Sequence, residues 1–482
     1  MAPILTRRLA LLVFLVLWGL ITHGTSAGTG DEPHYEIITH SLVFDHDLDV
    51  TTDYQNLNNR ALGGVFEPGA HARPGVDGRL RPVHDVGMPL LFAPYYAVAY
   101  VLAGAIVDHV PPRWLERARL NYTVVTRHFL SFAMIGITAA IAVRLLAIFA
   151  ALSGDRRRAF WWALLLVLSP PMLSHSFLFF TEIVSAALAL AVFVWLRSSP
   201  ANLPGALLAG TALGFMFLVH ARNAGLIAGL LVLALAESRR WRDRRVLVVF
   251  LTGAAILFAV RTAITHHLWG TWLTTPHERF GDVAAITPLL VESATRVTGW
   301  LFDQEHGLLP YAPIYLLVPA GWVALWKHDR RLCGAISLVV GAYLAVITMP
   351  LLNVHGWRGG WTPAARFLVP VTPFLAILAF ASVAWVRRIR GLVLALVAVQ
   401  VGIDAVVWQR PGLLWNNGIG TSALLTYLDG GTRWLSSAVP SIIEPLGSRS
   451  IALVAVAIAC WTMLTVWLNH EDHEDTKSYM DF

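Results

Sequence analysis

Long apolar stretches alternate with short polar ones along the whole chain. A helix needs about 20 mostly apolar residues to cross the hydrocarbon core of a membrane. The pattern predicts such helices over 5–23, 87–107, 127–150, 159–173, 177–196, 204–220, 223–237, 246–265, 307–326, 332–352, 366–385, 391–408 and 449–468. The shorter stretches are expected to be tilted helices or half-helices buried in protein. We therefore predict an all-α polytopic membrane protein with about 12 or 13 transmembrane helices.

Composition supports a single membrane domain. Of the 482 residues, 56% are hydrophobic and only 14% are charged, whereas soluble domains carry about 25% charged residues. We expect one transmembrane domain over 1–468 and a polar tail over 469–482. Cys333 and Cys460 both fall in apolar stretches, which predicts neither a disulfide framework nor a paired-cysteine metal site. The basic, apolar N-terminus resembles a signal peptide, but the many later spans favour an uncleaved first helix.

Basic clusters set the expected orientation, because cytoplasmic loops are enriched in Lys and Arg. Clusters at 239–245, 327–331 and 387–390 are predicted to be cytoplasmic, which places the loops 266–306, 353–365 and 409–447 on the external side. Arg7 and Arg8 place the long polar segment 24–86 there too. The cluster 155–158 also fits the cytoplasm, and the number of crossings between 87 and 180 then disagrees by one.

The net charge of +6 has the same explanation. We interpret the arginine clusters as topology signals first and contacts for anionic lipids second, and expect no nucleic-acid binding. Within the loop 266–306, the apolar spacing predicts an interfacial helix over 285–302.

The stretch GDEPHYE, residues 30–36, follows the first predicted span directly. Pro33 suits the first turn of a helix, so Asp31 or Glu32 could cap that helix. Alternatively, a carboxylate here acts as general base on an acceptor hydroxyl at the membrane surface, where partial burial raises its pKa.

Further acidic and histidine residues occupy the same polar segment. Asp45, Asp47 and Asp49 alternate as in a calcium loop, but Val50 and Asn56 stand where that loop needs Gly and Glu. A solvated acidic loop is one interpretation. A divalent cation is the other, and its candidate ligands are Glu32, His34, Asp45 and Asp47. His84 and Asp85 either reach a site at the membrane surface or mark the water boundary.

Other candidates lie at predicted helix ends. Glu182 stands in an apolar stretch, and ionisable groups at membrane depth indicate function by default; the alternative is a buried Glu satisfied by Thr181 or an Arg from elsewhere. Arg222 breaks the positive-inside trend and suits a lipid phosphate. Two later stretches, 302–315 and 355–370, could instead be interfacial anchors, since Trp rings stack on sugars but also favour the interface. They contribute Glu305, His306, Trp357, Arg358, Trp361 and Arg366.

Together, these motifs resemble the GT-C superfamily of integral membrane glycosyltransferases. The resemblance is carried by GDEPHY after the first span, FDQEHGLLPYAPIYLL and GGWTPAARFLVPVTPFLA. It is closest to the bacterial protein O-mannosyltransferase and aminoarabinose-transferase group, which is similar to glycosyltransferase family 39. It implies a GT-C-like bundle with a long first extracytoplasmic loop carrying short juxtamembrane helices.

The resemblance also implies an activity. A sugar moves from a polyprenyl-phosphate donor to a hydroxyl of a lipid, glycan or protein acceptor, with inversion, on the outer face of a bacterial inner membrane. The family's acidic residue matches Asp31 or Glu32, and Asp31 is our first choice for the base. Glu182 matches a second acidic motif, where many relatives have Asp. Arg222, Arg358 and Arg366 are implied to hold the donor phosphate. No cofactor is certain, although a divalent cation is an option.

The complete set of residues that we assign to substrate binding is His34, His84, Asp85, Glu182, Arg222, Glu305, His306, Trp357, Arg358, Trp361 and Arg366. Two other functions compete with glycosyl transfer. One is a transporter or flippase of a lipid-linked sugar, although no internal repeat is visible, and transporters tend to show one. The other is a non-catalytic scaffold of an envelope glycan assembly.

Overall fold

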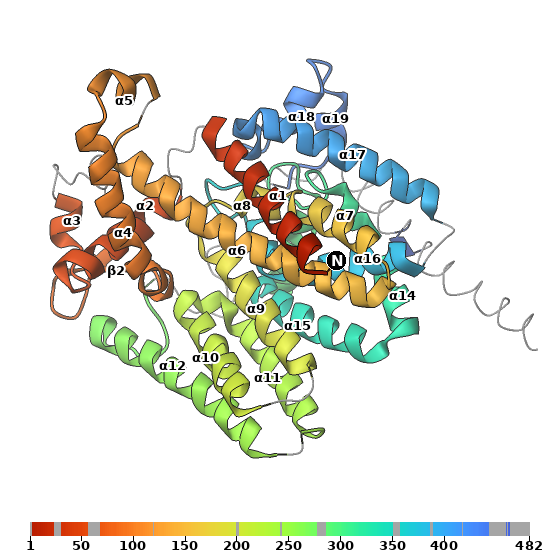
Figure 1. Ribbon diagram of the computed structural model, residues 1–482, viewed down its shortest axis with the longest axis horizontal. Coiled ribbons are helices and arrows are strands. Elements are labelled where there is room, and N and C mark those ends of the chain that lie inside the picture. Colours follow the sequence, from red (N-terminus) through yellow and green to blue (C-terminus); the bar gives the residue numbers. More distant parts are fainter. Residues whose placement is uncertain are drawn as a thin grey trace, which may run out of the picture.

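The protein is built almost wholly of helices (Figure 1). The computed structural model describes residues 2–23, 30–55, 68–118, 120–198, 202–241, 243–276, 286–349, 357–385, 389–416 and 418–442, with 459, 461 and 462. Within these ranges, eight helices are long and apolar enough to cross a membrane. The prediction of an all-α polytopic membrane protein is confirmed. The predicted tail, Cys460 and most of the predicted span 449–468 lie outside the described residues.

The eight long helices account for most of the bundle. They are α1 (Ala2–His23), α4 (Gly87–His109), α6 (Tyr122–Ser153), α11 (Ala224–Ser238) with the short η2 (Ala221–Asn223) before it, α12 (Arg245–Trp269), α15 (Arg330–Thr348), α16 (Thr372–Trp385) with η4 (Arg366–Val371) before it, and α17 (Arg390–Gln409).

Other predicted spans are shorter in the structure, so the number of full-length spans among the described residues is below the predicted 12 or 13. They are α7 (Arg156–Val167), α9 (Thr181–Arg197), α10 (Leu203–Val219) and α14 (Val318–His328), with η3 (Pro313–Leu317) before α14. The pair Pro170–Pro171 stops α7, because proline cannot continue a helix. The irregular segment 169–180, which includes α8 (Met172–His175), is buried throughout, as non-helical backbone at membrane depth must be.

The bundle has two chemically different ends. At one end, Arg158 of α7 donates to the carbonyl of Val383 in α16, and Glu237 of α11 pairs with Arg197 of α9. At the other end, Arg366 bonds Asp31 at the far end of α16. Basic helix ends therefore gather opposite Asp31. We call these the basic end and the acidic-cluster end.

The helix α4 begins and ends on the same side, which resolves the disagreement about the number of crossings. Its N-terminus follows Asp85, whose carboxylate accepts from the amide of Ala221 at the acidic-cluster end. Near its C-terminus, Asp108 bonds Tyr122 at the start of α6. The same part of α6 carries Arg127, which pairs with Glu36 close to Asp31. α4 therefore forms a hairpin with α6 without completing a crossing, and the cluster 155–158 falls at the basic end.

A group of short elements surrounds this hairpin (Figure 1). It contains α2 (Glu32–His40), η1 (Ser41–Asp45), α3 (Thr51–Gln55), α5 (Pro112–Ala118), and the antiparallel strands β1 (Ala72–Pro74) and β2 (Leu80–Pro82). Arg73 pairs with Arg81 in the middle of the two-stranded register. The buried ion pair between Glu36 and Arg127, at 2.5 Å, fastens α2 to α6.

The chain after residue 285 adds a second group of elements outside the long helices. These are α13 (Ile286–Phe302), as expected for 285–302, η5 (Pro411–Leu414), α18 (Ala423–Leu428) and α19 (Trp434–Ala438). The Asp303 carboxylate accepts from the amides of Glu305, His306 and Ile442. One buried carboxylate thus ties the end of α13 to the chain that follows α19.

Close helix packing depends on glycine at the contact between α14 and α16. A Cβ on Gly321 would overlap the backbone carbonyl of Leu378, whereas a Cβ on Gly334 of α15 would meet nothing within 4 Å. Gly321→Ala should destabilise the protein by about 1–3 kcal/mol through overpacking. Gly334→Ala is the control and should be neutral or stabilising by up to about 1 kcal/mol. Thermal unfolding in detergent checks both; equal unfolding temperatures for the two variants would contradict this packing.

Candidate functional site

Asp31 lies at the start of α2, held there by a tight turn. Gly30 has φ +56°, and a Cβ on it would press on the carbonyl of Trp361 and the ring of Phe180. The backbone carbonyl of Asp31 accepts from His34 and Tyr35, as the residue before a helix does. Its carboxylate makes no capping bond. The capping interpretation of this side chain is therefore wrong, and the carboxylate points to a different partner.

That partner is Arg366, the first residue of η4. Its Nη2 donates to Asp31 Oδ2 at 2.5 Å, and its Nε donates to Glu182 Oε1 at 2.6 Å. Its Nη1 donates to the Gly359 carbonyl at 3.1 Å. The side chains of Arg366 and Glu182 are only 8% and 2% exposed. One buried guanidinium thus joins two carboxylates that the chain places far apart.

Arg222 completes this group, which we call the Arg366 cluster: Asp31, Glu182, Arg222 and Arg366. Arg222 Nη1 lies 3.8 Å from Glu182 Oε1, and its guanidinium stacks 4.0 Å from the Phe367 ring centroid. Arg366 stacks in the same way on Phe180. Two cations face two anions, so the cluster is formally neutral. The looser contact of Arg222 makes it the cation more readily redirected to an incoming anion.

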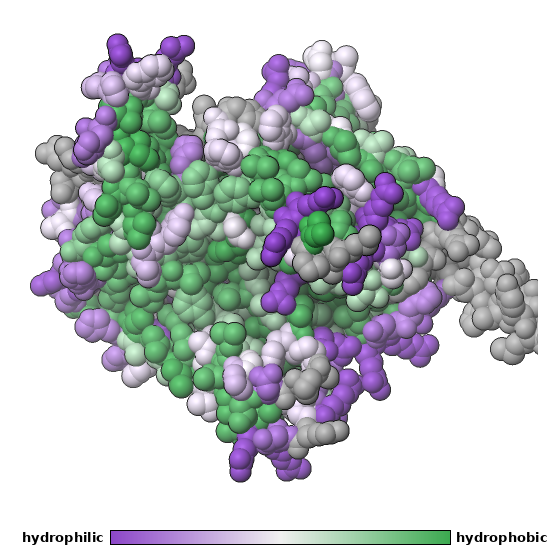
Figure 2. Space-filling view, in the orientation of Figure 1, coloured by the Kyte–Doolittle hydropathy of each residue, from purple (hydrophilic) through white to green (hydrophobic). Residues whose placement is uncertain are grey.

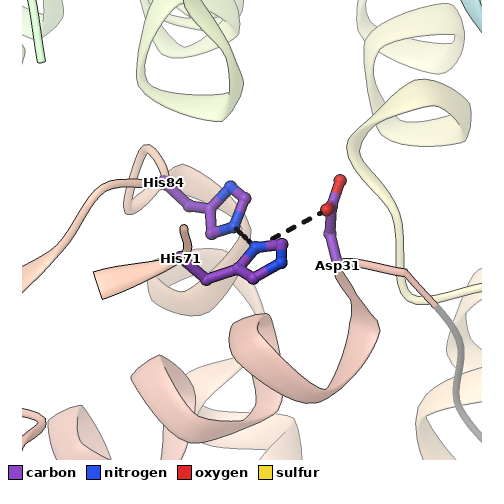
Figure 3. A group of neighbouring side chains, drawn as sticks. All are labelled: Asp31, His71 and His84. Atoms are coloured by element: carbon purple, nitrogen blue, oxygen red, sulfur yellow. Dashed lines mark hydrogen bonds and ion pairs between the residues drawn. The ribbon is translucent and has the colours of Figure 1, made fainter. Parts of the chain in front are cut away.

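Three histidines lie near Asp31, and Figure 3 shows two of them, His71 and His84. His71 Nδ1 lies 3.8 Å from Asp31 Oδ1 and 2.8 Å from His84 Nε2. His34 stacks on His71 with ring centroids 3.6 Å apart, and its Nδ1 bonds the Tyr54 hydroxyl. His71 lies just before β1, His84 just after β2 and His34 in α2. Because these elements pack together, all three histidines lie near the Asp31 carboxylate.

The electrostatics of Asp31 favour the ionised form. Burial alone would raise the pKa of its carboxyl, but Arg366 and His84 outweigh burial and hold that pKa well below its usual range. Burial lowers the pKa of His34 to about 3 and also lowers that of His71. At neutral pH the site therefore presents a carboxylate beside two uncharged imidazoles.

Two of the predicted residues have other partners. Glu32 Oε1 accepts from the amide of Phe179 at 2.7 Å, and Glu32 is 2% exposed. The side chain of Asp31 is 20% exposed, so Asp31 is the better placed of the two to meet a substrate. Asp85 pairs with Arg261 at 3.2 Å and accepts from Ala221. It fastens the start of α4 to α12.

The stretch 302–306 forms a separate buried group. Glu305 accepts from the amides of Gly418, Ile419 and Gly420, which wrap its carboxylate. The ring of His306 lies edge-on to Trp357, and neither ring nitrogen has a hydrogen-bond partner in the described structure, although Nε2 lies 4.0 Å from Glu305 Oε2. Burial, and then the charge of Arg358, lower the pKa of His306 to about 4.

The tryptophans and Arg358 differ in exposure. Trp357 is buried and its carbonyl accepts from Trp300, whereas Arg358 is exposed and Trp361 is 69% exposed. Since the Trp361 backbone lies against Gly30, the loop 357–361 borders the Arg366 cluster.

The four predicted metal ligands do not meet. Glu32 and His34 are engaged as described, and Asp45 and Asp47 are exposed beyond the other end of α2. Instead, Asp31, His71 and His84 offer ligand atoms within 4.8 Å of one another. Two imidazoles and a carboxylate form a donor set that zinc and similar ions accept. This trio could hold a cation with small shifts of its rings.

His71 was missing from the predicted site because its sequence neighbourhood carries no motif. It lies 40 positions after Asp31, in a turn-rich stretch that ends in β1. The weak signal in the sequence was that His71 is one of several histidines in the polar segment 24–86. Only the pairing of β1 with β2 brings it to His84.

Comparison with known proteins gives structural matches only. No protein-family model matches the chain, and no curated protein matches it. The structure is similar to the oligosaccharyltransferase of Archaeoglobus fulgidus in complex with Zn and sulfate, at 13% identity and a TM-score of 0.43, covering 91% of this chain and 58% of that one. The chain thus spans 58% of the length of that enzyme.

Two further structures are similar. One is ArnT from Cupriavidus metallidurans bound to undecaprenyl phosphate, at 13% identity and a TM-score of 0.40, covering 96% of this chain and 77% of that one. The other is the Archaeoglobus fulgidus enzyme tethered to an acceptor peptide, at 13% identity and a TM-score of 0.41, covering 96% of this chain and 54% of that one.

Removing Arg366 should destabilise the fold as well as the site. Arg366→Gln leaves Asp31 and Glu182 close together without their shared cation, and breaking a buried ion pair on one side costs about 3–5 kcal/mol. Arg358→Gln, which removes an exposed guanidinium from the adjacent loop, is the matched control. Thermal unfolding in detergent should show a clear drop for the first variant and no drop for the second. An unchanged unfolding temperature for Arg366→Gln would contradict the role of the cluster.

Proposed function

We propose that the protein is a GT-C-type glycosyltransferase that moves a sugar from a polyprenyl phosphate to a hydroxyl of a lipid, glycan or protein acceptor. The reaction inverts the anomeric carbon and takes place on the outer face of a bacterial inner membrane. The observation that carries the proposal is the Arg366 cluster. It sets a partly exposed carboxylate beside two arginines, at the end of a membrane bundle opposite its basic end.

The roles follow from the contacts. Arginine recognises phosphate through paired donors, so Arg222 and Arg366 would hold the donor phosphate. The acceptor oxygen attacks the anomeric carbon, and the bond from that carbon to the phosphate oxygen breaks. The phosphate leaves with the electron pair, and the arginines stabilise the charge that grows on it. The proton of the acceptor hydroxyl passes to Asp31.

Competition for Arg366 couples donor binding to this proton transfer. While Arg366 bonds Asp31, the pKa of that carboxyl is held low and Asp31 is a weak base. A donor phosphate that draws Arg366 away would remove the main interaction that lowers this pKa. Asp31 then becomes a competent base only when the donor is present, which limits unproductive chemistry at the empty site.

Asp31→Asn tests the proposal directly. The variant keeps the shape but cannot accept the proton, so kcat should fall by about 10²–10⁴-fold. The KM for the donor should stay equal or fall, because Arg366 loses a competitor. Glu116→Gln, an exposed carboxylate in α5, is the control. The assay is mass spectrometry of lipid-linked sugars and surface glycans in cells with and without each variant.

The outcomes are distinct. One polyprenyl-phosphate sugar should accumulate in cells that carry Asp31→Asn and not in cells that carry the control. Full product formation by a folded Asp31→Asn protein would overturn the role of Asp31. Transfer of the substrate across proteoliposome membranes without any chemical change would overturn glycosyl transfer itself.

The trio of Asp31, His71 and His84 carries an alternative role for Asp31: it would hold a divalent cation, with the carboxylate as a ligand rather than as the base. When bound, such an ion would supply positive charge for the donor phosphate. The fit rests on the ligand atoms lying within 4.8 Å of one another. His34, stacked on His71, and Tyr54, bonded to His34, would fix the orientation of the first imidazole.

Metal analysis after dialysis against Zn²⁺ or Mn²⁺ tests this trio. The purified protein should retain about one ion per chain, as a single three-ligand site predicts, and the double variant His71→Ala/His84→Ala should retain none. His46→Asn is the control, because His46 is exposed and its left-handed φ of 62° is tolerated by Asn. Equal retention by the double variant would show that the trio is not the ligand set.

A further inference from the structure

Two apolar grooves lie side by side at the basic end, away from the Arg366 cluster. The larger has a volume of about 890 Å³ and lies between α1, α7, α16 and α17. Its walls include Leu165, Val383, Val393 and Val397. The smaller, of about 640 Å³, lies between α1 and α7 and is lined by Leu11, Leu15 and Phe160, among others. Trp161 of α7 lines both grooves and separates them.

Each groove has its own pair of arginines. Arg158 and Arg390 line the larger groove, and Arg8 and Arg157 line the smaller. Arg157 and Arg158 are consecutive in α7, so the two pairs are adjacent. Figure 2 shows hydrophilic side chains gathered near the N-terminal end of α1, within an otherwise apolar face.

These four cations are not neutralised within the described parts of the chain. Arg158 donates to the carbonyl of Val383, which leaves its charge uncompensated. The carboxylate of Asp155, just before them, accepts from the backbone amides of Arg157 and Arg158 rather than from their guanidinium groups.

The larger groove also contains a carboxylate, Asp404, but it is far from the arginines. It lies 14 positions after Arg390 in α17, which is about 21 Å along a helix. That exceeds the depth of one leaflet's hydrocarbon, about 15 Å if the core is about 30 Å thick. Asp404 accepts from Ser169 and Gln400. It therefore does not oppose an anion bound near Arg158.

We propose that the two grooves together bind one anionic phospholipid with two phosphates and four acyl chains, a diphosphatidylglycerol, from the leaflet on the basic side. Each phosphate meets one arginine pair, and two acyl chains enter each apolar groove. Charge complementarity decides this occupant: four cations in two adjacent pairs match two linked phosphodiesters. A single-phosphate lipid would leave one pair without a partner.

This site is distinct from the proposed active site. α16 has Arg366 just before its first residue and lines the groove with Val383 and Ala384 near its last. The two sites therefore lie at opposite ends of the same helix, and loss of the lipid does not remove any group from the Arg366 cluster.

Native mass spectrometry of the full chain released from nanodiscs tests the proposal. The nanodiscs contain phosphatidylcholine with either diphosphatidylglycerol, phosphatidylglycerol or undecaprenyl phosphate at equal phosphate content. The wild-type chain should retain one diphosphatidylglycerol. Removing both pairs, in Arg8→Gln/Arg157→Gln/Arg158→Gln/Arg390→Gln, should lower the retained fraction at least tenfold.

Two further variants separate charge and shape. Arg330→Gln/Arg331→Gln removes exposed arginines of the same end outside the grooves and should retain the lipid as the wild type does. Ala405→Trp adds a ring to the lining of the larger groove and should lower retention with all arginines present. Thermal unfolding verifies that each variant is folded.

Three results would overturn the proposal. The first is retention of phosphatidylglycerol or undecaprenyl phosphate that equals or exceeds that of diphosphatidylglycerol and is lost when the four groove arginines are replaced. The second is an equal loss of lipid in Arg330→Gln/Arg331→Gln, which would indicate attraction to the whole basic face. The third is a groove that stays empty in the wild type, as it would if another segment of the chain occupied it. None of these results bears on glycosyl transfer, so the two proposals fail independently.

Discussion

The structure depends on one buried guanidinium that is shared by two carboxylates. Arg366 could not stay buried without Asp31 and Glu182, and neither carboxylate has an equivalent partner within the described structure. These two ion pairs hold three segments together: the start of α2, the start of α9 and the segment η4 that leads into α16. Burial makes the pairing strict, because an isolated charge away from water costs several kcal/mol. The histidines and Arg222 pack around these ion pairs.

The neutrality of that centre has a chemical meaning. A site with excess positive charge would bind any phosphate on the membrane surface, whereas a compensated one admits an anion only by displacing an internal partner. Under the proposed function, Arg222, the cation with the looser ion pair, would meet the donor phosphate first, and the tighter pair between Asp31 and Arg366 would open after it. Selectivity for a ligand that offers more than a bare phosphate follows from this order.

The sequence alone was enough for the fold class and to name all four members of the Arg366 cluster. Apolar stretches of about 20 residues cannot be read in many ways, and Asp31, Glu182, Arg222 and Arg366 stood out as charges where apolar residues dominate. Among the described residues there are fewer full-length spans than predicted, because the prediction followed the apolar composition of a stretch such as 159–173 and gave too little weight to Pro170 and Pro171, which end its helix early. The disagreement over the number of crossings had a similar origin, since α4 is apolar enough to cross the membrane and yet begins and ends on the same side.

Ion pairs between segments far apart in the sequence could not be predicted from the sequence either. Glu32 and Asp85 were further site candidates beside Asp31 in the sequence, but the amide of Phe179 and Arg261 engage them. His71 was overlooked because strand pairing, rather than any local spacing, brings it to His84.

The separation of 335 positions between Asp31 and Arg366 also governs how the protein is made. At about 5–20 residues per second, a ribosome needs roughly 20–70 s to travel from the first to the second. Asp31 is without Arg366 for the whole of that interval, and Glu182 is without it for the last 184 positions. Each nascent chain therefore carries two uncompensated acids at the membrane until η4 and α16 are delivered. The assembly of this site is therefore a late event of translation. An mRNA truncated before that point yields a chain whose first helices are inserted without the arginine that joins Asp31 and Glu182.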